Sequence, residues 1–254
     1  YEIADTEGFI LIHPEGTIDD MGFQFWNSGY FSEVDDVGFL SALIDTISSE
    51  YNINTSRVYS MGMSNGGFMS YRLACELSDK ISAIASVTGS MSTNQINTCN
   101  PISPVPIIQV HGTSDPTVLY NGSSGIEAID DVISFWVNFN NCNTQPIFNN
   151  IADVNLIDLC TAEHYVYENG DNETSVELYK ILNGGHTWPG ATIPLVGENT
   201  NQDLNASQVI WEFFNKCDMN GLIETNSNIQ EPKIKKKKLL KKRKVLCLKA
   251  MEQK

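Results

Sequence analysis

The stretch Arg57-Val-Tyr-Ser-Met-Gly-Met-Ser-Asn-Gly-Gly-Phe68 contains the pentapeptide G-x-S-x-G at residues 62–66. The residues before the pentapeptide predict a strand and those after it a helix, which would place the serine on a sharp turn. Gly62 and Gly66 carry no side chain to crowd this turn. A chance match in a loop is the alternative for the pentapeptide alone. In its strand–helix context the motif predicts a nucleophile, Ser64, beside an oxyanion donor, the backbone N–H of Asn65.

Strand and helix patterns alternate along most of the chain. Short apolar runs predict strands at 8–14, 57–63, 81–87, 106–112 and 176–182. Apolar residues three and four apart predict helices at 37–47, 67–77, 125–139 and 204–214. Residues 140–164 are rich in asparagine, and we expect them to be irregular. The alternation predicts an α/β fold whose mostly parallel sheet is covered by helices on both faces.

The charge of the chain is distributed very unevenly. Residues 233–254 hold eleven basic side chains and one acidic one, whereas the other 232 residues hold five basic and 30 acidic ones, a balance of −25. Such an acidic body repels nucleic acid and anionic membranes, so we expect neither as a partner. No apolar run approaches the length of a membrane span. We expect a monomer in which residues 1–217 form a single domain, large enough to be a catalytic domain.

The composition changes abruptly after Cys217. Residues 218–254 are rich in lysine, and we expect them to be a basic, disordered, low-complexity tail outside the domain. A basic helix on a membrane surface is the alternative.

The six cysteines favour disulfide bridges over a metal site. Spacings of 24 and 18 residues suggest two local bridges, Cys75–Cys99 and Cys142–Cys160, and hence export from the cell. Buried free thiols, as in a cytosolic protein, are the alternative. The chain has no C-x-x-C pair and no glycine-rich phosphate loop, so we expect no metal and no cofactor.

A nucleophilic serine needs a histidine base and an acid that orients it. Of the four histidines, His186 lies in Asn183-Gly-Gly-His-Thr-Trp-Pro-Gly190, where two glycines allow a close approach to a cleft. Asp115 directly follows a predicted strand, at the end where sites form in open α/β sheets. The order Ser64, Asp115, His186 is that of α/β hydrolases. The other acids considered are Asp130, Asp131 and Asp153.

Four motifs together resemble one family. These motifs are at residues 62–67, 72–75, 111–115 and 184–190. They are similar to the secreted poly(3-hydroxybutyrate) depolymerase and feruloyl esterase group of α/β hydrolases. The resemblance extends over about residues 5–217. The resemblance implies an α/β-hydrolase fold and a catalytic triad of Ser64, Asp115 and His186. It implies a secreted serine esterase that works through an acyl-enzyme, with Trp188 lining the substrate cleft.

The substrate is left open by the sequence. Trp188, Trp26 and Tyr120 are candidates to stack on a phenolic ring or to pack against a polyester chain. Feruloyl esters, acetylated xylan and polyhydroxybutyrate are therefore all possible substrates. A non-catalytic polymer-binding module that retains the fold is the alternative from another class.

The beginning of the chain departs from the family pattern. In the family, an earlier strand ends in a His-Gly loop that supplies the second oxyanion donor, and residues 1–8 look like the end of the helix that follows it. We therefore expect the sheet to lack its N-terminal strands. Loss of one oxyanion donor costs about a hundred- to a thousandfold in turnover, so weak activity is expected.

Overall fold

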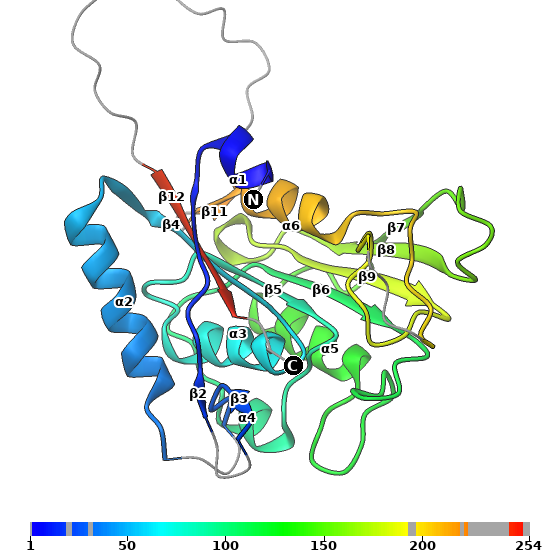
Figure 1. Cartoon of the computed structure of the whole chain (residues 1–254), viewed down its shortest axis with the longest axis horizontal. Coiled ribbons are helices and arrows are strands. Elements are labelled where there is room, and N and C mark those ends of the chain that lie inside the picture. Colours follow the sequence, from blue (N-terminus) through cyan, green and yellow to red (C-terminus); the bar gives the residue numbers. More distant parts are fainter. Residues whose placement is uncertain are drawn as a thin grey trace, which may run out of the picture.

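An eight-stranded sheet forms the centre of the computed structural model, which describes residues 2–18, 22–29, 33–192, 197–218, 221–222 and 244–250. Its order is β1-β12-β4-β5-β6-β9-β8-β7 (Figure 1). Six strands are parallel: β1 (Ile10–Ile12), β12 (Lys244–Ala250), β4 (Ile53–Met63), β5 (Ala83–Val87), β6 (Ile107–Gly112) and β9 (Val176–Leu182). The strands β8 (Thr161–Tyr167) and β7 (Ile147–Asn150) continue it in antiparallel pairs.

Helices cover both faces of this sheet (Figure 1). One face carries α2 (Asp36–Glu50), α3 (Asn65–Glu76), α4 (Thr93–Thr98) and α5 (Ile129–Phe139), and the other carries α1 (Glu2–Glu7) and α6 (Ala206–Phe214). The smaller elements are the pairs β2 (Thr17–Ile18) with β3 (Gln24–Phe25) and β10 (Cys217–Asp218) with β11 (Gly221–Leu222), and the 3₁₀ turn η1 (Asp171–Glu173). The predicted two-sided, mostly parallel α/β fold is confirmed.

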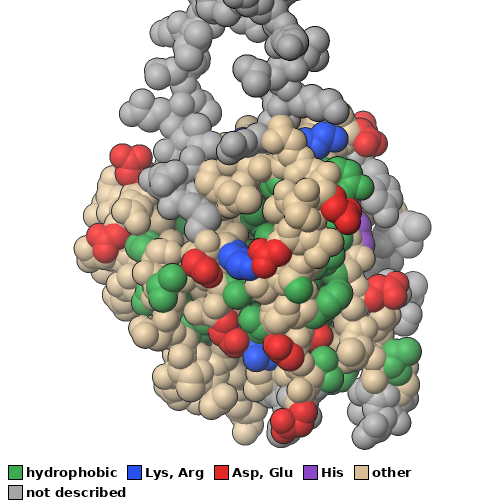
Figure 2. Space-filling model, turned by 90° about the vertical axis from the view of Figure 1, so that its left-hand side faces the viewer, with side chains coloured by type: hydrophobic (Ala, Val, Ile, Leu, Met, Phe, Trp, Pro, Cys, Tyr) green, Lys and Arg blue, Asp and Glu red, His purple; other side chains and the backbone are tan. Residues whose placement is uncertain are grey.

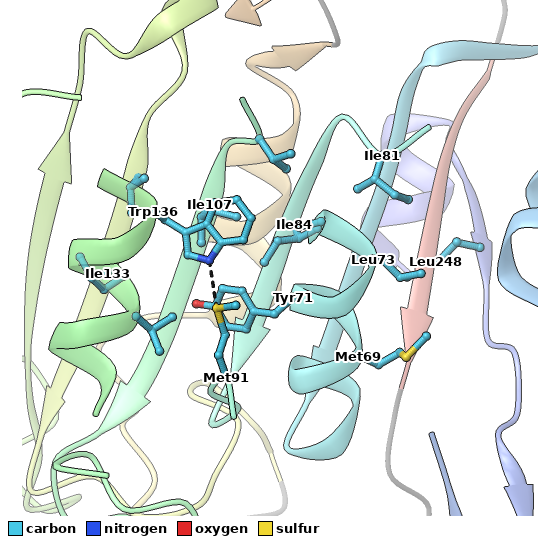
Figure 3. Packing of buried hydrophobic residues seen from close by; sticks show 14 of the residues in the cluster. Met69, Tyr71, Leu73, Ile81, Ile84, Met91, Ile107, Ile133, Trp136 and Leu248 are labelled. Atoms are coloured by element: carbon cyan, nitrogen blue, oxygen red, sulfur yellow. Dashed lines mark hydrogen bonds between the residues drawn. The ribbon is translucent and has the colours of Figure 1, made fainter. Parts of the chain in front are cut away.

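Two hydrophobic clusters lie on opposite faces of the sheet. On one face, Met69, Tyr71 and Leu73 of α3 pack with Trp136 of α5, whose Nε1 lies 3.3 Å from Met91 Sδ (Figure 3). On the other face, α6 packs on strand residues that point the opposite way, such as Tyr59, whose ring stacks on Phe214. Because the central strands are buried on both faces, their sequences are continuous apolar runs rather than alternating apolar and polar residues.

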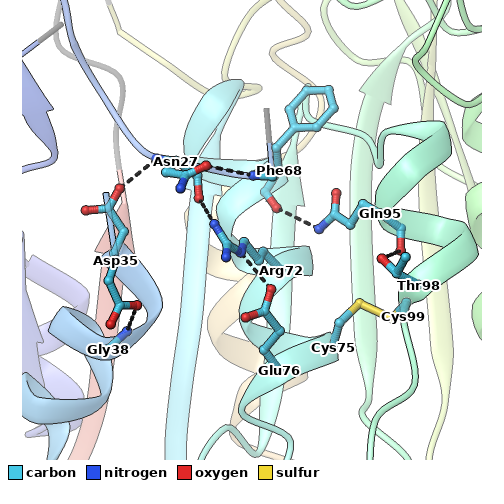
Figure 4. A network of polar contacts seen from close by, with 12 residues as sticks. Asn27, Asp35, Gly38, Phe68, Arg72, Cys75, Glu76, Gln95, Thr98 and Cys99 are labelled. Carbon is cyan, nitrogen blue, oxygen red and sulfur yellow. Dashed lines mark hydrogen bonds and ion pairs between the residues drawn. A yellow bond between two sulfur atoms is a disulfide. The ribbon is translucent and has the colours of Figure 1, made fainter. Parts of the chain in front are cut away.

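Local side-chain caps fix where two helices begin. Asp35 Oδ1 accepts from Gly38 N at 2.8 Å before α2 (Figure 4), and Asn205 Oδ1 accepts from Gln208 N at 3.1 Å before α6. Asn205 is therefore the cap of the closing helix. Each cap satisfies an amide that has no partner inside its helix.

The expectation of an irregular segment at 140–164 is wrong in part, because it contains β7 and the first residues of β8. The residues of β8 pair antiparallel with β9, and Phe148 of β7 packs against Tyr165 with ring centroids 5.2 Å apart. The edge strand β7 is exposed, and β8 beside it is mostly half-buried. Their polar residues face solvent, so they lack the apolar runs that identify the central strands.

The expectation of a disordered tail is wrong for residues 244–250. They form β12, which lies between β1 and β4 with Cys247 opposite both Leu11 and Tyr59. Leu246, Cys247 and Leu248 are at most 1% exposed. The composition of the whole tail conceals this apolar run, because lysines surround it. Residues 223–243, which include most of those lysines, lie outside the described residues, and the domain boundary at 217 stays a prediction.

One of the two predicted disulfides is present. Cys75 in α3 is bonded to Cys99 after α4, with the Cα atoms 5.0 Å apart (Figure 4). The predicted Cys142–Cys160 bridge is wrong, because both thiols are free and buried. Cys142 packs in the cluster on the α3 face and Cys160 in the cluster on the α6 face, so the sheet separates them.

The surface in Figure 2 carries more acidic than basic side chains, as the charge of residues 1–232 predicts. Within the described ranges, no helix is both long enough and apolar enough to cross a membrane.

Candidate active site

Ser64 lies on the turn between β4 and α3. It is 7% exposed and has a φ of 53°, a left-handed conformation that is costly for a residue with a side chain. Backbone hydrogen bonds hold it there: Ser64 N donates to Val87 O at 2.9 Å, and Ser64 O accepts from Gly67 N at 2.8 Å. The neighbouring strand and the first turn of α3 thus stabilise a strained serine at the carboxyl edge of the sheet.

The structure shows a lack of space at Gly67, the residue that follows the pentapeptide. A Cβ atom there would lie 2.6 Å from Ser86 Oγ and 3.1 Å from Gly89 Cα. A side chain at Gly67 would therefore force the start of α3 away from the end of β5, and Ser64 would move with it.

Asn65 presents its backbone N–H next to the serine. Its side chain is engaged elsewhere, since Oδ1 accepts from Trp26 N at 2.7 Å and Nδ2 donates to Trp26 O at 3.0 Å. Within the described part of the chain its backbone N–H has no hydrogen-bond partner. This amide at the positive end of α3 is suited to an oxyanion. The second donor, and the expected missing N-terminal strands, stay predictions.

Asp115 and His186 meet because their strands are neighbours. Asp115 follows β6, His186 follows β9, and His186 Nδ1 lies 2.8 Å from Asp115 Oδ2. Both side chains are buried. An ionised carboxylate can only accept, so Nδ1 carries the hydrogen and Nε2 keeps its lone pair. This is the tautomer that a general base requires.

The carboxylate of Asp115 has three further partners. Its Oδ1 accepts from Thr117 N at 2.8 Å and from Val118 N at 2.9 Å, and His111 Nε2 lies 3.3 Å from Oδ2. Burial alone would raise the pKa of Asp115, but the hydrogen bonds from His111 and His186 outweigh it and hold that pKa far below its usual value. The acid is therefore ionised whenever His186 is able to act as a base.

Close backbone packing fixes the loop that carries His186. A Cβ on Gly112 would lie 2.2 Å from Gly184 O, and a Cβ on Gly185 would lie 2.8 Å from Glu198 Cβ. His186 N also donates to Glu198 Oε2. The two glycines before His186 thus allow the approach that the sequence predicts.

Ser64 lies at the same sheet edge as this pair, in the strand order β4-β5-β6-β9. Among the described residues no hydrogen bond joins Ser64 Oγ to His186. The roles of Ser64, Asp115 and His186 remain proposals.

Two of the three predicted aromatic substrate contacts do not face a cleft. Trp26 is 1% exposed and packs in the core against Phe39, and Tyr120 is 5% exposed and donates to Asp130 Oδ1 at 2.6 Å. Their rings are therefore covered by protein. Trp188 is half-buried and donates from Nε1 to Ser207 Oγ at 3.1 Å, so its predicted role in the cleft remains open.

Two residues outside the predicted triad support the pair. His111 contacts Asp115, and it lies four residues before it in the same motif, a spacing that is visible in the sequence. Glu198 comes from a later loop and gives no such signal. The rejected acid Asp130 contacts Tyr120 instead of His186, and the described residues contain no cluster of three or more metal-ligating side chains.

Comparisons with known proteins agree with the fold and the motifs. Residues 34–143 match the phospholipase/carboxylesterase family model. The chain is 27% identical to the bifunctional acetylxylan esterase/xylanase XynS20E of Neocallimastix patriciarum over 89% of this chain and 29% of that protein. It is 30% identical to feruloyl esterase B of Piromyces equi over 72% of this chain and 34% of that protein. It is 29% identical to feruloyl esterase D of Neurospora crassa over 75% of this chain and 59% of that protein.

The mostly parallel sheet and the buried Asp–His pair at the edge that carries Ser64 are the arrangement found in α/β hydrolases. The chain is thus similar to a carboxylesterase family over residues 34–143 and to feruloyl and acetylxylan esterases over most of its length. It spans about a third of the length of the first two relatives. The resemblance to polyhydroxybutyrate depolymerases stays a prediction.

Proposed function

We propose that this protein is a serine esterase that hydrolyses carboxylic esters through an acyl-enzyme. The observation that carries the proposal is the 2.8 Å contact between His186 Nδ1 and Asp115 Oδ2, which leaves His186 Nε2 free to accept a proton at the sheet edge that holds Ser64. The family-model match and the names of the relatives support ester hydrolysis.

In the proposed mechanism Ser64 Oγ attacks the ester carbonyl while His186 Nε2 takes its proton. The backbone N–H of Asn65 donates to the oxyanion of the tetrahedral intermediate. The protonated His186 then gives its proton to the leaving alkoxide, and the acyl group stays on Ser64. Water, activated by His186, attacks the acyl-enzyme and releases the acid, while Asp115 keeps the imidazole in its orientation throughout.

The substrates we propose are feruloyl or acetyl esters of plant cell-wall polysaccharide, as the names of the relatives suggest. We propose a secreted location, which the Cys75–Cys99 disulfide supports. The expectation of a monomer stays a prediction.

A fluorophosphonate probe together with a chromogenic acetate ester tests the mechanism. Ser64→Ala should abolish labelling and lower ester turnover about a thousandfold or more. Ser114→Ala is the matched control, because Ser114 lies at the same sheet edge but its hydroxyl donates only to Asn183 Oδ1. Full turnover in the Ser64 variant would refute the assignment. A folded protein that neither labels nor turns over would favour a binding module.

The released acid identifies the substrate. The protein is incubated with methyl ferulate, acetylated xylan and 3-hydroxybutyrate oligomers, and the products are quantified. Ferulate or acetate is the expected product. Release of 3-hydroxybutyrate alone would instead indicate a depolymerase.

A further inference from the structure

A cavity of about 260 Å³ lies between α1, α6 and the sheet face that they cover. Its exposed lining is about equally polar and apolar, and in the apolar part Phe9 stacks on Trp211 with centroids 4.3 Å apart. The apolar lining includes Phe9, Leu11, Met61, Ile210, Trp211 and Phe214. Ser64, Asp115 and His186 do not line it, so this cavity is separate from the candidate active site.

Lys249 of β12 brings a positive charge to the cavity wall. It is half-buried, and its Nζ lies 4.8 Å from the centroid of the Trp188 ring. No carboxylate in the described ranges forms an ion pair with it. Burial lowers the pKa of Lys249, which means that its ammonium is poorly solvated. An anion in the cavity would give the lysine an ion-pair partner.

Two neutral donors from the start of α6 line the same cavity. Asn205 Oδ1 already accepts from Gln208 N, and Ser207 Oγ already accepts from Trp188 Nε1. The amide hydrogens of Asn205 and the hydroxyl hydrogen of Ser207 have no acceptor among the described residues. Both lie at the positive end of α6, which favours an anion further.

We propose that this cavity binds a small carboxylic acid, with its apolar or aromatic body against the aromatic walls and its carboxylate on Lys249 and Ser207. The volume is just below the ~300–1,000 Å³ of most ligand pockets, which limits the body to one ring or a short chain. Glu2 of α1 also lines the cavity, and its charge disfavours a dianion such as phosphate. The inference rests on neither the triad nor the proposed esterase activity.

Titration with cinnamate and with hexanoate tests the site, by calorimetry and by tryptophan fluorescence, since Trp211 lines the cavity. At least one acid should bind, and the neutral cinnamamide should bind at least about tenfold more weakly than cinnamate. Lys249→Met should weaken binding of the acid at least about tenfold. Lys249→Arg should retain it. The acid that binds more tightly shows whether the apolar part of the preferred ligand is aromatic or aliphatic.

Lys180→Met is the matched control. Lys180 likewise sits over an aromatic ring, 4.7 Å from the Tyr120 centroid, but it does not line this cavity. Its loss should leave binding unchanged. If Lys249→Met were poorly folded, Ser207→Ala should still give a threefold or larger loss. Any of three results would overturn the proposal. The first is equal affinity in the wild type and both cavity variants, the second is equal binding of the acid and the amide, and the third is no binding of either acid. Absence of esterase activity would leave it intact.

Discussion

The edge of the sheet that carries Ser64, Asp115 and His186 and the strand β12 are stabilised by different forces. The site edge depends on polar contacts between loops, such as the four partners of the Asp115 carboxylate. By contrast, β12 depends on burial of Leu246 and Leu248 and on pairing with strands on both sides. Changes at the site edge should therefore affect turnover more than stability, and changes in β12 the reverse.

The largest expected effect is that of Asp115→Asn on turnover. The amide offers an N–H in place of a carboxylate oxygen, so His186 loses the acceptor that fixes its tautomer. We expect kcat to fall about 10³–10⁴-fold, whereas the melting temperature should change little. Hydrolysis of a chromogenic ester and thermal unfolding measure the two effects. Asp130→Asn, which replaces the charged acceptor of Tyr120 with a neutral amide oxygen, should leave kcat within about twofold. Equal kcat in both variants would contradict the proposed pair.

The next effect is that of Leu246→Asp on stability. A carboxylate would be buried in the centre of the sheet without a partner, at a cost of about 3–5 kcal/mol in the free energy of unfolding. Urea unfolding measures this. Leu119→Asp is the control, since Leu119 is 45% exposed and should tolerate the charge. If both variants were equally stable, β12 would not be part of the sheet.

A smaller effect distinguishes a local change in the active site, which lowers kcat, from a general loss of stability. Gly112→Ala would push a Cβ against Gly184 O and displace the His186 loop, so kcat should fall about ten- to a hundredfold. Gly170→Ala is a matched clash far from the site, because its Cβ would lie 2.7 Å from Asn140 O. It should lower stability and leave kcat unchanged. Steady-state kinetics at a temperature where both variants are folded compare them.

The smallest effect is a change in the pH dependence of stability. Burial raises the pKa of Cys247 in β12 from near 9 to about 12. The folded state thus holds the thiol proton more tightly, so stability is retained below pH 9 and lost as the pH rises toward 12. The expected slope is about 1.4 kcal/mol per pH unit.

Cys247→Ala should make this slope shallower without abolishing it, because burial also raises the pKa values of the Cys142 and Cys160 thiols. Val245→Ala, which shortens a neighbouring buried side chain that does not titrate, should leave the slope unchanged. The measurement is urea unfolding at pH 8, 9 and 10. An unchanged slope in the Cys247 variant would show that this thiol is not buried in the folded protein.

The sequence predicts the fold class and the Asp–His pair because their signals are local. A strand, a turn and a helix around Ser64, and short motifs around Asp115 and His186, each need only a few neighbouring residues. Trp26 and Tyr120 illustrate the limit: an aromatic residue suits a cleft and a core equally well, and only the packing around Phe39 or the contact with Asp130 decides. The failed Cys142–Cys160 bridge has a similar cause, since spacing along the chain does not reveal that a sheet lies between the thiols.

The place of β12 could not be predicted, since no local signal connects it to its neighbours. Cys247 pairs with Tyr59, which is nearly 190 residues away along the chain. Residues 245–248 are four apolar residues among lysines. Such a run can be recognised as a buried strand only when it is known that β1 and β4 leave a space between them.

The position of β12 also bears on how the protein folds. The pairs β4–β5, β5–β6 and β8–β9 join strands that are close in sequence, whereas β12 must close a loop of nearly 190 residues before it gains any contact with β4. Such closure is slow, so β1 and β4 should remain apart late in folding. Until then each presents an unpaired edge that can join the edge of another molecule. The yield of refolded protein should therefore fall as its concentration rises.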